Sequence, residues 1–243
     1  MVGASAPKGA RVAVGGHSCA CAWKWPVTNS ISSVKPSRLR RRGAAGTLVT
    51  RRVGLFGGTF DPPHVGHLVT AVNVRHALGL DLLVLMVANV PWQKAGSRAI
   101  TPALDRLAMV EAAVADVEGL EAGALEIELG GASYTADTLA VLAERHPAAE
   151  LFTVVGDDAA AGLSTWERWA EVVRRSRMVV VDRPGEPVEL DPAIDWIRIE
   201  VPRLEVSSTD LRARVSDGRP LDYLVTDPVL DLIEARGLYR DAP

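Results

Sequence analysis

The stretch that decides the fold is Gly57-Gly58-Thr59-Phe60-Asp61-Pro62-Pro63-His64-Val65-Gly66-His67. It follows an apolar run, Val53 to Phe56, and precedes an amphipathic run, Leu68 to Leu78. This order predicts a strand, a glycine-rich turn and a helix that carries two histidines near its start. Glycines let a backbone come close to a bulky anion, and the N–H groups at a helix start favour phosphate. The stretch therefore predicts a nucleotide-phosphate site with imidazole N–H donors.

Outward from this stretch, strand-like and helix-like patterns alternate along the chain. Strands are predicted at Val53–Phe56, Leu82–Ala88, Leu125–Leu129, Leu151–Val155, Met178–Val181 and Ile197–Val201. Helices are predicted at Gly66–Leu78, Pro102–Ala115, Thr135–Arg145, Thr165–Arg174, Ser208–Val215 and Asp227–Arg236. The alternation is typical of an α/β, Rossmann-like, doubly wound parallel sheet, here with a small C-terminal helical part. Ligands of such sheets bind at the carboxyl ends of the strands, where the glycine-rich turn lies.

Composition limits the partners. The net charge of −3 predicts no nucleic-acid partner, and the longest apolar runs are too short to span a bilayer, which predicts no membrane partner. The two cysteines, Cys19 and Cys21, both precede residue 51, so no disulfide framework is expected in the rest of the chain. The expected lack of disulfide bonds in this part of the chain fits a reducing, cytoplasmic location.

The first fifty residues differ from the rest, because they are basic and contain no Asp or Glu. We expect a folded domain over residues 51–243 and, over residues 1–50, a basic extension that is disordered or lies upstream of the true translation start. A transit peptide and a nucleic-acid-binding tail remain open as alternatives.

The opening stretch resembles the T/H-x-G-H pattern of nucleotidylyltransferases, in the longer form G-G-T-F-D-P-x-H-x-G-H of bacterial nicotinate-nucleotide adenylyltransferases. A second stretch, Val206-Ser207-Ser208-Thr209-Asp210-Leu211-Arg212, resembles that family's I-S-S-T-x-I-R motif, with Val206 and Leu211 in place of Ile. The resemblance implies the nucleotidylyltransferase fold and adenylyl transfer from ATP to nicotinate mononucleotide. The products would be deamido-NAD and pyrophosphate, in NAD biosynthesis.

The resemblance also implies roles for residues on the ATP side. The implied catalytic residues are His64, His67 and Arg212. The implied ATP-binding residues are Gly57, Gly58, Thr59, Phe60, His64, His67, Arg183, Ser207, Ser208, Thr209 and Arg212. A simple turn at Arg183 remains an alternative, and for Asp61 we favour a structural role in the turn over a catalytic one.

Two further stretches carry the resemblance to the acceptor side. Ser133-Tyr134-Thr135-Ala136-Asp137-Thr138-Leu139 is similar to the family's S-Y-T-x-D-T-L, and Gly156-Asp157-Asp158 with Trp166 and Trp169 resembles G-x-D…W-x-x-W. Gln93-Lys94 departs from the His-Lys that the family often has there. The implied acceptor-binding residues are Lys94, Arg106, Tyr134, Thr135, Asp158 and Trp166. A surface position for Arg106 and a core position for Trp166 remain alternatives.

ATP chemistry implies Mg²⁺, which is held mainly by substrate phosphates. The sequence shows no carboxylate cage, so we expect no metal-ligating set in the protein itself. Alternatives to nicotinate mononucleotide are nicotinamide mononucleotide and phosphopantetheine as acceptors. An alternative of another class is a catalytically silent, nucleotide-binding regulatory module. Homo-oligomerisation is left open.

Overall fold

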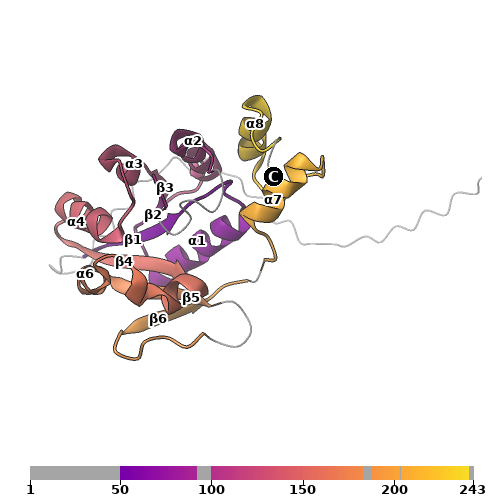
Figure 1. Ribbon diagram of the computed structural model, residues 1–243. Coiled ribbons are helices and arrows are strands. Elements are labelled where there is room, and N and C mark those ends of the chain that lie inside the picture. The colour runs from indigo at the N-terminus through magenta and orange to yellow at the C-terminus, as the bar shows by residue number, and fades with distance from the viewer. Residues whose placement is uncertain (1–49, 92–99, 183–187, 203, 241–243) are drawn as a thin grey trace, which may run out of the picture. The chain divides into compact units, whose positions relative to one another are not determined.

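The strand predicted at Val53–Phe56 is β1 (Arg51–Gly58), which lies inside a six-stranded, all-parallel sheet of order β3-β2-β1-β4-β5-β6 (Figure 1). The computed structural model describes residues 50–91, 100–182, 188–202 and 204–240. The other strands are β2 (Leu82–Val87), β3 (Leu120–Gly123), β4 (Ala149–Gly156), β5 (Arg177–Asp182) and β6 (Trp196–Glu200). The expected extension falls almost entirely on residues 1–49, outside the described residues, so the boundary near residue 50 stays a prediction.

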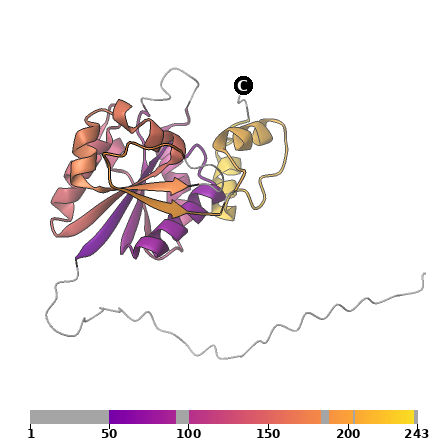
Figure 2. The same ribbon diagram turned by 90° about the horizontal axis from the view of Figure 1, so that it is seen from below.

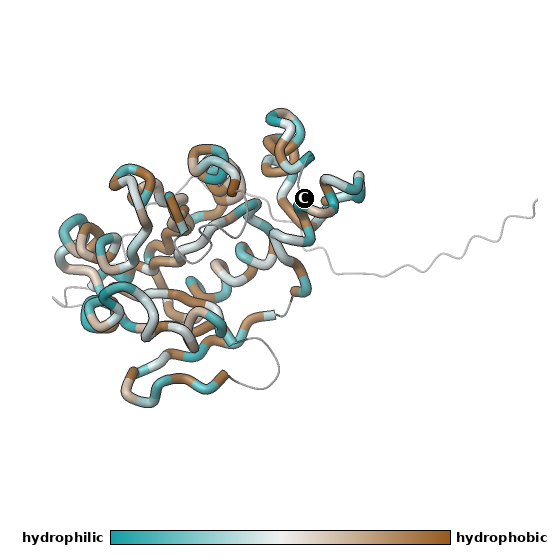
Figure 3. The backbone as a smooth tube through the Cα atoms, viewed as in Figure 1, coloured by the Kyte–Doolittle hydropathy of each residue, from teal (hydrophilic) through white to brown (hydrophobic). Residues whose placement is uncertain are grey.

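Helices cover both faces of the sheet (Figures 1 and 2). One face packs against α1 (Val65–Leu78) and α2 (Ala103–Val114). The helices α7 (Ser208–Ser216) and α8 (Asp227–Ala235) join the same hydrophobic core, with α8 packed against α2. The other face packs against α3 (Leu125–Leu129), α4 (Thr135–Arg145) and α6 (Trp169–Arg175), while α5 (Asp157–Ala161) follows β4 directly. Figure 3 shows the hydrophobic residues gathered on the central strands, as expected for strands buried on both faces. The predicted fold class is confirmed.

The strand order positions the site. Chain connections leave β1 toward β2 on one side and later reach β4 on the other, so the order reverses between β1 and β4. In open α/β sheets a ligand crevice forms at such a point, outside the carboxyl ends of the strands. Gly58 ends β1 and Gly156 ends β4, so this crevice begins between these two glycines.

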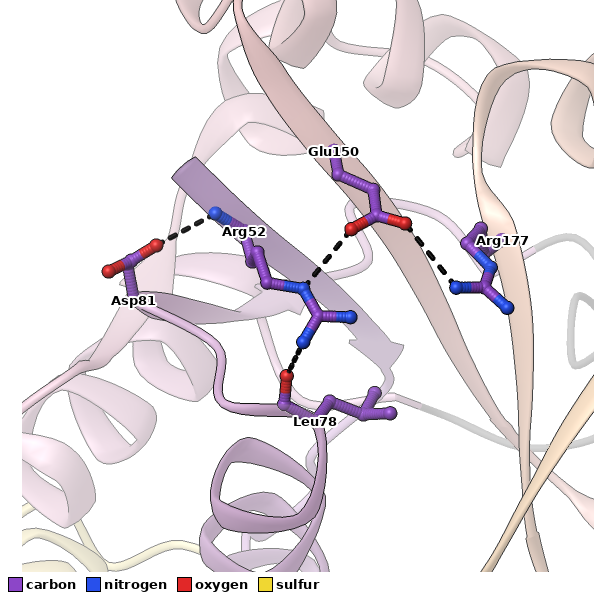
Figure 4. Close-up of polar contacts among 5 residues, drawn as sticks. All are labelled: Arg52, Leu78, Asp81, Glu150 and Arg177. Carbon is purple, nitrogen blue, oxygen red and sulfur yellow. Dashed lines mark hydrogen bonds and ion pairs between the residues drawn. The ribbon is translucent and has the colours of Figure 1, made fainter. Parts of the chain in front are cut away.

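The opposite end of the sheet is fastened by a polar cluster (Figure 4). The Arg52 side chain donates from Nε to Glu150 Oε2 at 3.1 Å, and Arg177 Nη1 donates to Glu150 Oε1 at 3.4 Å. The Arg52 backbone N–H donates to Asp81 at 2.8 Å, and its guanidinium also donates to the carbonyl of Leu78. The cluster ties β1, β4 and β5 together far from the glycine-rich turn, which leaves the carboxyl ends for ligands.

Two predicted elements were wrong. Leu125–Leu129 is the short helix α3 and not a strand, because its alternating pattern is ended by Gly130 and Gly131, both at positive φ, and its Leu125 packs into the core. The third strand is instead Leu120–Gly123, four residues paired with β2. Gly123 packs closely there, because a Cβ would lie 2.6 Å from the Met86 methyl group, which would have to shift.

The predicted helix at Thr165–Arg174 was also wrong in its first part. A 3₁₀ turn covers Leu163–Thr165, Trp166 is extended, and Arg168 adopts a positive φ of 54° before α6 begins at Trp169. Trp166 and Trp169 therefore do not lie one turn apart on a single helix. Trp166 lies before α6 and faces a cavity. Among the helices described, none is long and apolar enough to cross a membrane.

Candidate active site

His64 and His67 stand at the start of α1, as the sequence predicts. His64 is the N-cap residue and His67 lies in the first turn, and their rings stack with centroids 3.7 Å apart. The ring of Phe60 packs edge-on against His67 at 5.0 Å between centroids. The two imidazoles are therefore held side by side at a helix N-terminus, where the backbone N–H groups and the dipole favour an anion.

A hydrogen bond selects the tautomer of His67. The backbone N–H of His64 donates to His67 Nδ1 at 3.2 Å. Because an N–H group can only donate, Nδ1 must be the acceptor nitrogen, and the neutral ring then carries its proton on Nε2. His67 thus presents an N–H donor on the side of the ring away from the backbone.

Glycine is required at two positions of the signature stretch. A Cβ on Gly58 would lie 2.8 Å from the ring of Phe60, and a Cβ on Gly66 would lie 3.0 Å from both His64 Nδ1 and the Val206 side chain. Gly66 thereby lets the segment before α7 approach His64. A Cβ on Gly57 meets no described atom within 4 Å, so its role as an approach point for an anion stays a prediction.

Arg212 joins the second motif to the first. It is buried on α7, donates from Nη1 to the carbonyl of Asp61 at 2.8 Å, and donates from Nη2 to Thr209 Oγ1 at 3.1 Å. Ser207 caps α7, because its Oγ accepts the Asp210 N–H at 3.1 Å. The hydroxyl of Ser208 donates to the carbonyl of Pro62 at 2.8 Å. A permanent cation is thus fixed beside the loop that precedes His64.

Asp61 is a structural anchor, as favoured from the sequence. Its side chain is 1% exposed, and its Oδ1 accepts the hydroxyl of Tyr239 at 2.9 Å. Burial, followed by the neighbouring Asp61 carboxylate, raises the pKa of Tyr239 above its ordinary value, so the phenol keeps its proton and donates it. The backbone N–H of Val65 donates to the carbonyl of Leu224 at 3.0 Å. We call this set of hydrogen bonds the C-terminal clasp. It joins Asp61 to Arg212 and Tyr239, Pro62 to Ser208, and Val65 to Leu224.

Two cavities meet at the carboxyl ends of β1 and β4. The larger has a volume of about 660 Å³, and its polar lining includes His64, His67, Ser207, Ser208, Thr209 and Arg212. The smaller has a volume of about 250 Å³ and is lined by Tyr134, Thr135 and Trp166, among others. Phe56, Gly58, Thr59 and Gly156 line both. One ligand in each cavity would therefore meet over the glycine-rich turn.

The smaller cavity is largely apolar but contains the start of a helix. Tyr134 is the N-cap of α4 and Thr135 its first residue. Arg168 braces this turn by donating to both carboxylate oxygens of Asp137, at 2.8 and 2.6 Å, which holds the pKa of that carboxyl below its usual range. The indole N–H of Trp166 has no hydrogen-bond acceptor among the described residues. An aromatic face and a helix N-terminus are thus available to a flat, anionic ligand.

The sequence pattern of the cytidylyltransferase-like family matches residues 55–214, which include both motifs and both cavities. The chain belongs to this family. Relatives within it include a probable nicotinate-nucleotide adenylyltransferase of Corynebacterium kroppenstedtii, 43% identical over 77% of this chain and 90% of the relative. A protein of the same name in Mycolicibacterium vanbaalenii is 42% identical over 81% of this chain and 95% of the relative. The resemblance stated from the motifs is confirmed.

Solved structures agree with the cytidylyltransferase-like fold. A putative nicotinate-nucleotide adenylyltransferase of Vibrio parahaemolyticus has a TM-score of 0.57 at 22% identity, over 79% of this chain and 96% of that one. The Plasmodium falciparum nicotinic acid mononucleotide adenylyltransferase complexed with NaAD has a TM-score of 0.61 at 16% identity, over 78% and 97% of the two chains. At these identities the likeness establishes the fold alone.

The structure of this cytidylyltransferase-like protein brings most predicted ATP-side residues together at the larger cavity. Gly57 lines the smaller cavity, while Arg183 lies outside the described residues. On the acceptor side, Tyr134, Thr135 and Trp166 line the smaller cavity, Asp158 lines the larger one, and Lys94 lies outside the described residues, as does Gln93. The ligand contacts of all these residues stay predictions. In the described part of the chain, no three His, Cys, Asp or Glu side chains gather as a metal site.

Arg106 is buried and donates to three backbone carbonyls. The surface position is wrong, because its side chain is 1% exposed. It donates to the carbonyls of Thr101 at 2.8 Å, Thr59 at 2.8 Å and Asn89 at 3.0 Å. Arg106 thus ties the turn after β1 to the segment after β2, and a direct phosphate contact stays a prediction.

Three residues of the site were missed from the sequence, namely Asn89, Glu126 and Tyr239. Asn89 follows a strand directly, as site residues of α/β sheets do, and this position was a usable signal. Glu126 was missed because the sequence pattern wrongly predicted a strand at Leu125–Leu129. Tyr239 lies 178 residues from Asp61, and no local pattern connects the two.

Proposed function

We propose that this protein transfers the adenylyl group of ATP to nicotinate mononucleotide, forming deamido-NAD and releasing pyrophosphate. One observation carries the proposal: two cavities, one with stacked histidines and a buried Arg, the other with an aromatic face and a helix N-terminus, share the glycine-rich turn. The names of relatives about 40% identical over three quarters of the chain support it. The complex of the Plasmodium falciparum protein with NaAD is in keeping with nucleotide substrates.

The reaction needs no nucleophile from the protein. A phosphate oxygen of the mononucleotide attacks the α-phosphorus of ATP and forms a new P–O bond. The bond to the bridging oxygen breaks, and pyrophosphate leaves with that electron pair. Charge grows on the transferred group and on the leaving oxygens, so the protein acts by positioning and by charge stabilisation.

On the ATP side, the larger cavity provides three groups for this task. His67 offers its Nε2–H donor, His64 lies stacked against it, and Arg212 adds a permanent positive charge. Phosphates seated here would also face the N-terminus of α1. Because these groups are held by the protein before ATP arrives, they need little rearrangement as charge develops. The presence of His64, His67 and Arg212 together counts against a catalytically silent module.

On the acceptor side, the smaller cavity suits the pyridine ring. Trp166 would stack on the ring, and the N–H groups around Tyr134 and Thr135 at the start of α4 would bind its carboxylate. We assign Lys94 to the mononucleotide phosphate and Asp158 to the ribose, and Arg106 would act on the phosphate site through the Thr59 carbonyl that it holds. Asp158 on the larger cavity, beside the shared Gly156, is compatible with a ribose that spans the junction.

Mg²⁺ fits this site as an ion that enters with ATP. The described lining of the larger cavity has hydroxyls, two histidines and one Arg but only two carboxylates, Asp158 and an Asp61 that already accepts the Tyr239 hydroxyl. Such a set does not enclose a cation, whereas triphosphate oxygens and water do. Bound in this way, Mg²⁺ supplies neutralising charge.

We further propose a cytoplasmic enzyme without nucleic-acid or membrane partners.

The test is pyrophosphate release from ATP and Mg²⁺ with three acceptors in parallel: nicotinate mononucleotide, nicotinamide mononucleotide and phosphopantetheine. We expect the largest kcat/KM with nicotinate mononucleotide, because the helix N-terminus at Thr135 binds a negatively charged carboxylate more strongly than a neutral amide. A larger value with either other acceptor would replace the proposed acceptor. No pyrophosphate with any of the three would overturn the proposed activity.

A second prediction concerns Trp166. Changing Trp166→Ala is expected to raise the KM for nicotinate mononucleotide roughly 3- to 10-fold, the scale of one lost aromatic stack, with the KM for ATP little changed. Trp196→Ala is the matched control, because Trp196 packs against the same hydrophobic clusters but lines neither cavity. Steady-state kinetics with each substrate varied decides. Equal rises in both KM values would assign Trp166 to the core instead.

A further inference from the structure

A buried carboxyl group lies in the smaller cavity without a role in the reaction described above. Glu126 on α3 is 8% exposed and lines the cavity together with Tyr134, Thr135 and Trp166. Burial raises its pKa, while hydrogen bonds from Ser133 and Thr138 oppose that rise. The described lining of this cavity contains no Lys, Arg or His. Glu126 therefore depends on hydroxyl donors for its stabilisation there.

One donor, Ser133, lies in the loop that precedes α4, and the other, Thr138, lies in the first turn of α4. Thr138 Oγ1 donates to Glu126 Oε1 at 2.9 Å, and Ser133 forms a side-chain hydrogen bond with the same carboxyl group. Ser133 Oγ also accepts the backbone N–H of Asn89 at 2.8 Å. Since that N–H can only donate, the Ser133 hydroxyl proton is left for Glu126. The Asn89 N–H thus donates to Ser133, and the Ser133 hydroxyl donates to Glu126. Thr138 is the second hydroxyl donor to Glu126.

This chain of bonds fixes the loop against the end of β2. Asn89 Nδ2 donates to the carbonyl of Gly131 at 2.9 Å, and the Ser133 N–H donates to the carbonyl of Val90 at 3.2 Å. The segment is therefore held at Gly131 and at Ser133 by the residues that follow β2. Tyr134 and Thr135 follow Ser133 directly, so their backbone N–H groups are aimed by the same bonds.

We propose that Glu126 is the positioning residue of the acceptor-binding loop, acting through Ser133 and Thr138 to aim the Tyr134 and Thr135 backbone at the acceptor. The inference rests on the proposed function, because it assigns this loop to the pyridine carboxylate. Glu126 accepts two hydroxyl protons and touches no reacting atom. Its loss should weaken acceptor binding and leave the ATP side, built by α1 and α7, unchanged.

The change Glu126→Gln tests the proposal at constant volume. The neutral Gln oxygen is a weaker acceptor than a carboxylate oxygen, and the Gln nitrogen, which carries only donors, cannot accept a hydroxyl proton. Losing one bond to a charged group predicts a rise of about 10-fold in the KM for nicotinate mononucleotide, with the KM for ATP within 2-fold of the original. Glu128→Gln is the matched control on the same helix, since Glu128 has a side chain 60% exposed and faces Arg145 at 3.5 Å. We expect it to change neither KM.

A second pair of variants separates positioning from mere support of the fold. Thr138→Val removes one donor while keeping shape, and Thr138→Ser keeps the hydroxyl. We expect the acceptor KM to rise with Val and to remain near the original with Ser.

Distinct outcomes overturn the inference and the proposed function. If the unaltered protein is active with nicotinate mononucleotide but Glu126→Gln leaves its acceptor KM unchanged, Glu126 does not position the loop. Equal rises in the ATP and acceptor KM values, at a lowered melting temperature, would make Glu126 a general support of the fold. If the unaltered protein transfers adenylyl groups only to another acceptor, the proposed function fails, and the KM for that acceptor still tests Glu126.

Discussion

Replacing His67 by Ala is expected to lower kcat at least about 100-fold, the scale for losing one prealigned donor to developing charge. The His64 N–H to His67 Nδ1 bond places the ring proton on Nε2, and Ala offers neither the donor nor the ring that stacks on His64. Since the donor matters most in the transition state, kcat should fall more than the KM for ATP rises. Steady-state pyrophosphate release measures both.

His76→Ala is the control for this change. His76 lies on the same helix, in its last turn, and is exposed to solvent. Its loss should leave kcat within 2-fold, and the melting temperatures of both variants report whether the fold survives. A kcat close to normal in the His67 variant would remove this residue from catalysis.

Arg212→Met is expected to lower kcat by a similar factor, about 100-fold, because it removes a buried permanent cation from the cavity proposed for the triphosphate. The change also takes a donor from the Asp61 carbonyl, which costs roughly 1–3 kcal/mol of unfolding free energy if the carbonyl stays dry. Arg212→Lys keeps the charge but not the two directed bonds, and we expect an intermediate kcat. Kinetics and chemical denaturation measured on the same samples separate the two effects.

Arg214→Met is the matched control on α7. Arg214 pairs with Asp210 at 2.7 Å on the same helix and lines neither cavity. We expect its kcat to stay within 2-fold of the original. If Arg214→Met and Arg212→Met lower kcat equally, the effect belongs to the helix and not to a cation at the phosphates.

The parts of the site predicted best from sequence are those in which neighbouring residues form the structure. The strand, glycine-rich turn and histidine-bearing helix occupy consecutive positions, and β1 and α1 begin and end within a few residues of their predicted bounds. The cap at Ser207 is also local, since Ser207 and Asp210 are three residues apart. Short-range rules of capping and periodicity suffice for such elements.

The parts that were missed depend on tertiary contacts. Leu125–Leu129 alternates like a strand, but five residues with this pattern also fit one helical turn, and the packing of Leu125 with the bonding of Glu126 decides between them. Arg106 could lie on a helix surface by its residue type, yet it is bonded to the nearby Thr101 carbonyl and to the carbonyls of Thr59 and Asn89 in two other segments. Neither set of partners can be read from nearby sequence.

The C-terminal clasp has a consequence for how the protein is made. Asp61 lies 178 residues before Tyr239, which donates to it, and Arg212 and Leu224 also follow late in the chain. At a synthesis rate of about 5–20 residues per second, this separation takes roughly 10–35 s to translate. The histidine loop therefore leaves the ribosome long before the residues that hold it. A nascent chain has both histidines but no finished site for the triphosphate, which forms only after Tyr239 has been added.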